Sequence, residues 1–139
     1  MNILVDSSIW SLALRRRSVD LNPTERALVV ELTQLISEGR ARIIGLVRQE
    51  VLSGIKTAVQ FEKVREALEP FRDEPTETSD YESAARAGNA CRSKGIAVST
   101  ADMLICAVGA SRGWSIFTTD PDFKHYEQIL SIQLHSIRA

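Results

Sequence analysis

The chain has 139 residues, of which 44% are hydrophobic and 25% charged, and its formal net charge is -1. These values predict one cytoplasmic globular domain over residues 1–139, and they exclude nucleic-acid binding through overall positive charge. Cys91 and Cys106 lie 15 positions apart without a CxxC motif, which predicts reduced thiols in the core. We expect no signal peptide and no membrane span, because Asp6 interrupts the short apolar run at the N-terminus.

The first ten residues, MNILVDSSIW, predict a buried strand followed by a helix over residues 7–14. The apolar run at 3–5 does not alternate, which is typical of a strand covered on both faces in a parallel sheet. Asp6 then lies at the carboxyl end of this strand, where open α/β sheets bind their ligands. A helix N-cap is the alternative explanation of Asp6.

Short strands and helices alternate along the rest of the chain. Helices are predicted for residues 22–39, 46–54, 58–68 and 79–94 and from residue 99 onward. Strands are predicted for residues 42–45, 114–118 and 132–137, with a weakly signalled edge strand at 74–78. Since no tight hairpin signal appears, this alternation predicts a mostly parallel sheet of four to five short strands with helices on both faces.

Four acidic residues follow the predicted strands or begin the predicted helices: Asp6, Glu50, Asp102 and Asp120. Each has an ordinary explanation, since aspartate caps helices and a helical glutamate is usually solvated. The carboxyl ends of parallel strands share one edge, however, so all four can face one cleft. No separate explanation accounts for four carboxylates at one edge of a sheet.

Carboxylates that crowd together cannot all stay ionised without compensation, and a divalent cation provides it. Hard oxygen ligands favour Mg²⁺ or Mn²⁺, whereas His125 and His135 lack the spacing of zinc ligands. The sequence also has no Gly-rich phosphate loop. An acidic metal cleft of this kind predicts metal-dependent hydrolysis of phosphodiester bonds.

The predicted catalytic set consists of Asp6, Glu50, Asp102, Thr118 and Asp120. Asp6 and Asp102 are predicted to bind the metal directly, and Asp120 directly or through water. Glu50 would orient water or assist a second metal, and Thr118 would support the cluster by hydrogen bonds. Phosphate contacts are predicted for Arg15, Arg16, Arg17, Arg48 and Lys56. The alternative for the three consecutive arginines is that they complement the end of the preceding helix.

The segments ILVDSSIW, QEVLSG, TADMLICAVG and FTTDPDF resemble, in this order and spacing, the PIN-domain family, and in particular VapC-type toxin ribonucleases of type II toxin–antitoxin systems. The resemblance spans essentially the whole chain, with Cys106 where alanine is more usual, and it leaves the role of Asp122 open. It implies an α/β/α sandwich and an endoribonuclease dependent on Mg²⁺ or Mn²⁺. It also implies an RNA substrate, homodimers and a small antitoxin that covers the acidic cleft.

Two alternatives belong to other functional classes. An aspartyl-phosphate phosphotransfer enzyme also carries an aspartate after its first strand, but it commonly has a second acid two residues later, where this chain has Ser8. A non-catalytic binding module of the PIN fold would tolerate the loss of acids, yet all four are present. Metal-dependent RNA cleavage without a phosphoenzyme would distinguish the nuclease from both.

Overall fold

A computed structural model describes residues 1–138, which form a three-stranded parallel sheet of order β2-β1-β3. The strands are β1 (Ile3–Val5), β2 (Ala41–Arg42) and β3 (Ser115–Phe117), and Ile3 of the central strand lies opposite Ala41 and Ser115. All three residues of β1 are buried, which explains why the sequence there is continuously apolar.

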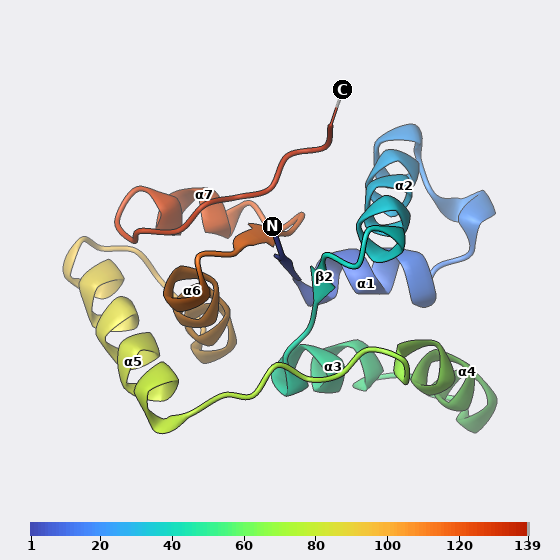
Figure 1. Cartoon of the computed structure of the whole chain (residues 1–139), viewed down its shortest axis with the longest axis horizontal. Helices are drawn as coiled ribbons and strands as arrows, with labels where there is room; N and C mark the ends of the chain where they lie inside the picture. The colour runs from blue at the N-terminus through green and yellow to red at the C-terminus, as the bar shows by residue number, and fades with distance from the viewer. Residues whose placement is uncertain (139) are drawn as a thin grey trace.

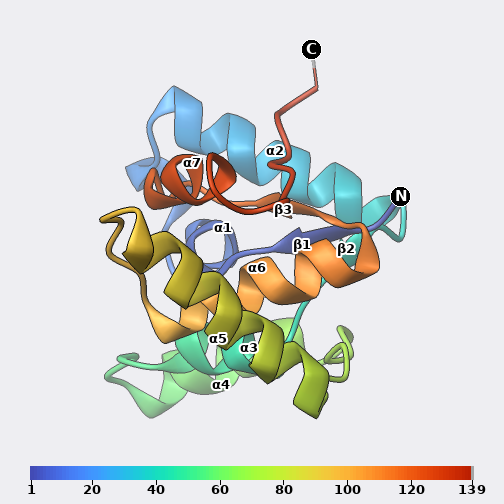
Figure 2. The same ribbon diagram turned by 90° about the vertical axis from the view of Figure 1, so that its left-hand side faces the viewer.

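The helices form a layer on each side of this sheet. Figure 1 shows α1 and α2 on one side and α5 and α6 on the other, and the perpendicular view in Figure 2 agrees. The predicted α/β/α architecture is therefore confirmed. The helices are α1 (Ser7–Leu14), the 3-10 turn η1 (Ser18–Asp20), α2 (Pro23–Ser37), α3 (Gly45–Leu52), α4 (Ala58–Leu68), α5 (Thr78–Ser93), α6 (Thr100–Arg112) and α7 (Asp122–Glu127). None of the helices in this part of the chain has both the length and the apolar character to cross a membrane.

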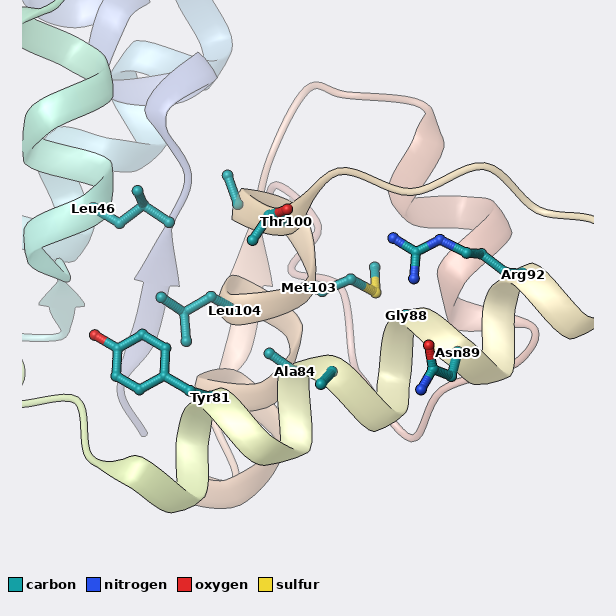
Figure 3. A pocket seen from close by; sticks show the side chains of 11 residues that line it. Leu46, Tyr81, Ala84, Gly88, Asn89, Arg92, Thr100, Met103 and Leu104 are labelled. Carbon is teal, nitrogen blue, oxygen red and sulfur yellow. The ribbon is translucent and has the colours of Figure 1, made fainter.

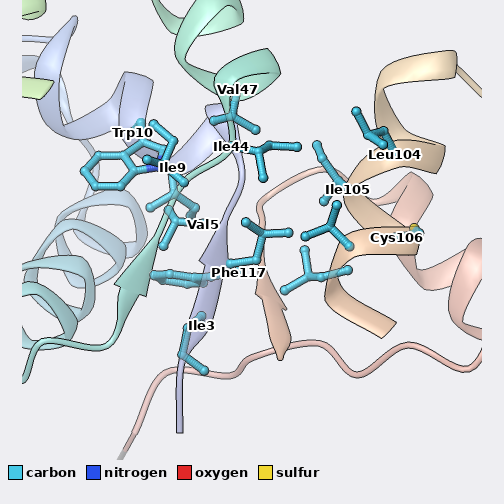
Figure 4. Packing of buried hydrophobic residues seen from close by; sticks show 14 of the residues in the cluster. Ile3, Val5, Ile9, Trp10, Ile44, Val47, Leu104, Ile105, Cys106 and Phe117 are labelled. Atoms are coloured by element: carbon cyan, nitrogen blue, oxygen red, sulfur yellow. The ribbon is translucent and has the colours of Figure 1, made fainter. Parts of the chain in front are cut away.

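The core lies on both faces of β1. Figure 4 shows Ile9 and Trp10 of α1 on one side of the strand and Ile105 and Cys106 of α6 on the other. Every residue of Met103–Gly109 in α6 is buried, so the middle of this helix lies within the core on all sides. Both cysteines are buried free thiols, as predicted. The sheet is thus fixed from two sides, which holds the ends of its strands in place.

Local signals placed α2 correctly. The Asn22 side chain accepts a hydrogen bond from the Glu25 N–H at 2.8 Å, and the Glu25 carboxylate accepts one from the Asn22 N–H at 3.0 Å. This reciprocal capping, with Pro23 at the first helical position, explains why the helix begins where the sequence predicts it. Gly39 follows the helix with φ at +68°, a conformation that favours glycine.

The predicted number of strands was too high. Residues 132–137 contribute only an isolated bridge between Leu134 and Ile116, and residues 74–78 form no strand. Beside β2 there is one bridge, between Ile43 and Asp73, and Pro75 follows too closely for the ladder to continue. The second strand is also shorter than predicted, because Gly45 already begins α3.

The start of α5 was wrong by one position. Ser79 and Glu82 have the spacing of a capping box, which favours a start at residue 79, but the helix begins at Thr78, and the N–H of Glu77 donates to the Asp80 carboxylate at 2.9 Å. Asp80 is fixed by Arg112 of α6, whose Nη1 lies 2.5 Å from Oδ1. A contact between two helices therefore decided between two similar local signals.

Candidate metal centre

Asp6 lies between β1 and α1, and its side chain does not cap the helix. Its Oδ2 accepts hydrogen bonds from Ser8 Oγ at 2.8 Å and from Thr118 Oγ1 at 2.7 Å. The residue is 5% exposed, and no side-chain capping bond to α1 is present. The N-cap explanation therefore accounts for the backbone of Asp6 but not for its buried carboxylate.

Two hydroxyls join Asp6 to the loop after β3. Thr118 Oγ1 also accepts the N–H of Asp120 at 3.0 Å, and Ser8 Oγ accepts the N–H of Thr119 at 3.1 Å. Thr118 thus makes hydrogen bonds of the kind that the sequence predicted for it. Ser8 was missed as a supporting residue, although its position two residues after Asp6 was the available signal.

Asp102 lies in the first turn of α6 and is held at two points. Its N–H donates to Ser99 Oγ at 3.0 Å, and its Oδ2 accepts a hydrogen bond from the Tyr126 hydroxyl at 2.8 Å. Burial raises the pKa of Asp102, and the charges of Asp120 and Asp6 raise it further, whereas the Tyr126 bond opposes the shift. Asp102 therefore faces the other acids of the predicted set.

Tyr126 is a site residue that the sequence reasoning missed. Burial and the hydrogen bond to Asp102 raise the pKa of its phenol, so the hydroxyl remains a donor at neutral pH. The available signal was its position four residues after Asp122, which places both on one face of a short helix.

Three carboxylates form a compact group: Asp102, Asp120 and Asp122. One oxygen from each lies within 4.8 Å of the others. Asp120 also accepts the N–H of Asp122 on Oδ1 at 2.9 Å, in the turn before α7, whose N-cap residue is Pro121. Several carboxylate oxygens at such separations suit a hard divalent cation such as Mg²⁺ or Mn²⁺.

Glu50 of α3 lies near two of these acids, Asp6 and Asp102. Burial raises the pKa of Glu50, and the charges of Asp6 and Asp102 raise it further, while a hydrogen bond with Ser7 opposes the shift. The fold therefore brings all four predicted acids near one another and adds Asp122. Glu50 and Asp6 lie outside the compact group of three.

Among the described residues 1–138, no basic side chain forms an ion pair with these acids. Among the ion pairs of residues 1–138, none involves Asp6, Glu50, Asp102, Asp120 or Asp122. A set of partly buried carboxylates without an arginine or lysine partner is costly unless a cation from solution occupies it. The donor set and the charge both fit a divalent metal.

Two of the predicted phosphate contacts have structural partners instead. Arg15 donates to the Ser53 carbonyl at 3.1 Å and thereby binds the end of α3. Arg48 donates to Asp73 Oδ1 at 2.9 Å and to the Leu68 carbonyl at 3.0 Å, and also to the Phe71 carbonyl. These bonds give both guanidinium groups a structural role, and a contact of Arg15 or Arg48 with phosphate stays a prediction.

The remaining basic candidates are exposed. Arg17 and Lys56 have exposed side chains, and Arg16 lies 3.6 Å from Glu25 with its own side chain 46% exposed. Arg16 and Arg17 follow the last turn of α1 rather than lying in it, so they do not complement that helix end. These three cations therefore remain available to a phosphate backbone.

A mainly apolar groove lies beside the acidic group and not within it. It has a volume of about 650 Å³ between α3, α5 and α6, and Figure 3 shows Leu46, Ala84 and Leu104 among its lining side chains. No carboxylate lines it. Apolar lining does not bind a hard cation, so the metal centre is assigned from the carboxylate geometry.

Comparisons with known proteins agree with this fold. The PIN domain family matches residues 3–129. The fold is similar to FitAcB from Neisseria gonorrhoeae (TM-score 0.75, 20% identity, 96% of each chain covered). It is also similar to VapBC-5 from Mycobacterium tuberculosis, a member of the VapBC family of toxin-antitoxin systems (TM-score 0.67, 19% identity, 99% of this chain and 98% of that one). No curated protein sequence matches. The family match covers most of the chain, which therefore belongs to the PIN domain family.

Proposed function

We propose that this chain is a divalent-metal-dependent endoribonuclease and the toxin of a toxin–antitoxin pair. One observation carries the proposal: five acids from separate elements approach one another without a neutralising cation. RNA phosphodiester hydrolysis is the chemistry that such a centre suits. A bound Mg²⁺ or Mn²⁺ would lower the pKa of a coordinated water and offset negative charge on the phosphate.

Each acid has a defined part in this proposal. Asp6 and Asp102 bind the metal directly, and Asp120 binds it directly or through water. The compact group adds Asp122 as a further oxygen donor. Glu50 would orient the attacking water. Ser8 and Thr118 hold the Asp6 carboxylate at the end of β1.

RNA approaches this centre past exposed cations, for which Arg16, Arg17 and Lys56 are the candidates. We further propose that residues 1–139 act as one nuclease domain in the cytoplasm. The partners are a cognate antitoxin and a second copy of the chain. The similarity of the fold to VapBC-5 supports the antitoxin, and light scattering of the purified chain with and without its antitoxin tests both partners.

The direct test is cleavage of total RNA with and without Mg²⁺ or Mn²⁺. Asp6→Asn and Asp102→Asn should each lower cleavage more than about 100-fold, since loss of residues that merely support metal ligands already costs about 10- to 100-fold. Asp20→Asn is the matched control, because Asp20 is an exposed acid on η1. Cleavage that survives in either site variant would overturn the assignment.

The alternatives predict other outcomes of the same experiment. A binding module would retain RNA without cleaving it under any metal. An aspartyl-phosphate enzyme would form a phosphoenzyme on Asp6, where Ser8 now donates a hydrogen bond to the carboxylate. Discrete products that require both metal and Asp6, without a phosphoenzyme, would support the nuclease alone.

A further inference from the structure

Tyr126 is a buried tyrosine whose hydroxyl reaches the acidic group. It is 1% exposed, and its ring packs edge-on against Phe123 with centroids 5.2 Å apart. The hydroxyl donates to Asp102 Oδ2 at 2.8 Å. The aromatic packing fixes the ring, so the hydroxyl has a defined position relative to the carboxylate.

Asp102 and Tyr126 come from different helices, 24 positions apart. α6 carries Asp102, whereas α7 carries both Tyr126 and Asp122. Asp122 also donates its N–H to Asp120. The short helix α7 therefore contacts two of the three clustered carboxylates and supplies the third.

We propose that Tyr126 is a positioning residue that orients the Asp102 carboxylate for the divalent cation. The inference rests on the proposed metal-dependent function. A hydrogen bond to one carboxylate oxygen restricts rotation of the group, which lowers the entropy lost when a metal binds. Outer partners of metal ligands typically change metal affinity by about 10- to 100-fold.

Tyr126→Phe removes the hydroxyl and keeps the packed ring. The chain offers a matched control in Tyr81→Phe, because Tyr81 is 55% exposed and its hydroxyl lies 2.9 Å from Thr76 Oγ1. Calorimetric titration with Mn²⁺ should show affinity about 10- to 100-fold weaker in Tyr126→Phe and unchanged in Tyr81→Phe. Cleavage lost by Tyr126→Phe should return at high Mn²⁺, whereas purely structural damage would not respond to metal.

A second measurement needs no substitution. In the wild-type chain labelled with ¹³C-tyrosine, saturating Mg²⁺ should shift the Cζ resonance of Tyr126 and leave that of Tyr81 unchanged. If the wild type and Tyr126→Phe bind Mn²⁺ with equal affinity, the positioning role of Tyr126 is overturned, but the metal centre is not. Absence of Mn²⁺ binding by the wild type would overturn the metal centre and the positioning role together.

Discussion

Buried and partly buried carboxylates have contrasting surroundings in two regions of this molecule. On α5, Asp80 is held by Arg112 with Nη1–Oδ1 and Nη2–Oδ2 distances of 2.5 and 3.0 Å. At the carboxyl end of the sheet, the described side chains that donate hydrogen bonds to the carboxylates of Asp6 and Asp102 all do so through hydroxyl groups. The first region is neutralised within the protein, and the second is not.

The pKa values follow this difference. The Arg112 guanidinium lowers the pKa of Asp80, while burial and neighbouring acids raise the pKa of Asp102 and of Glu50. Acids that resist ionisation in a shared site are a known mark of function, whereas a paired acid fixes structure. Asp80 therefore holds α5 to α6, whereas Asp102 and Glu50 belong to the acids that can bind metal.

The largest expected loss of stability is in the neutralised region. Arg112→Met leaves the buried Asp80 without its partner and should lower the free energy of unfolding by about 3 kcal/mol. Urea denaturation at pH 7 measures the change. Arg65→Met is the control, because its pairs with Glu62 and Glu69 are exposed and worth about 1 kcal/mol or less.

The pH dependence of that loss has a defined sign. The folded pKa of Asp80 is lowered, so its contribution is present above the unfolded pKa of about 4 and disappears as the pH falls below it. The difference between Arg112→Met and the wild type should therefore shrink below that pH. An unchanged difference in acid would show that Arg112 acts through packing and not through charge.

A smaller loss is expected where hydroxyls support Asp6. Thr118→Val removes the 2.7 Å hydrogen bond to the carboxylate and the acceptor for the Asp120 N–H. The free energy of unfolding should fall by about 1.5 kcal/mol, which is the lower end of the range for hydrogen bonds to charged groups. Thr33→Val, which removes a hydroxyl bonded to the Val29 carbonyl on an exposed helix position, should have little effect. Equal losses in both variants would contradict the supporting role of Thr118.

In the metal-free protein, Asp102→Asn should leave the free energy of unfolding unchanged or raise it. Because the folded pKa of Asp102 is raised, its charge opposes folding, and the variant should equal or exceed the wild type by up to about 1 kcal/mol at pH 7. In the wild type, stability should decline as the pH rises from about 4 through the raised pKa, and the variant should decline less. A clear destabilisation at pH 7 would mean that the ionised carboxylate contributes to the fold.

The smallest effect concerns RNA binding. In an Asp102→Asn background, Arg17→Ala should reduce the slope of log affinity against log salt by about 0.7 for each phosphate of single-stranded RNA that Arg17 neutralises. Arg48→Ala should leave that slope unchanged and lower stability, since Arg48 binds Asp73 and two carbonyls. A reduced slope in Arg48→Ala with an unchanged slope in Arg17→Ala would show instead that Arg48 contacts RNA.

The main features of the fold and the four acids were predictable because their signals are local. A continuous apolar run identifies β1 and thus the position of Asp6, and the helix start at Ser99 and the turn at Asp120 place the other aspartates. A parallel sheet then requires that strand ends share one edge. Resemblance to the PIN-domain family added the expected RNA substrate, the homodimer and the antitoxin, whereas the expected metal and phosphodiester hydrolysis already followed from the four acids.

The remaining features depend on contacts between distant segments. The role of Tyr126 depends on how α7 packs against α6, and that of Arg48 on the return of residues 68–73 to α3. The predicted final strand contains apolar residues at suitable positions, yet only Leu134 pairs with β3. Sequence periodicity indicates which residues are buried but not how many backbone hydrogen bonds a segment makes with a neighbouring strand.

Thermal and urea unfolding in the presence of MnCl₂ tests the central claim most directly. Mn²⁺ at about 100 times its dissociation constant should stabilise the wild type by about 2.7 kcal/mol. Asp102→Asn should lose most of this gain at the same concentration, and Asp20→Asn should keep it. A wild type that Mn²⁺ and Mg²⁺ leave unchanged, or an Asp102→Asn variant stabilised as much as the wild type, would contradict a metal centre at these carboxylates.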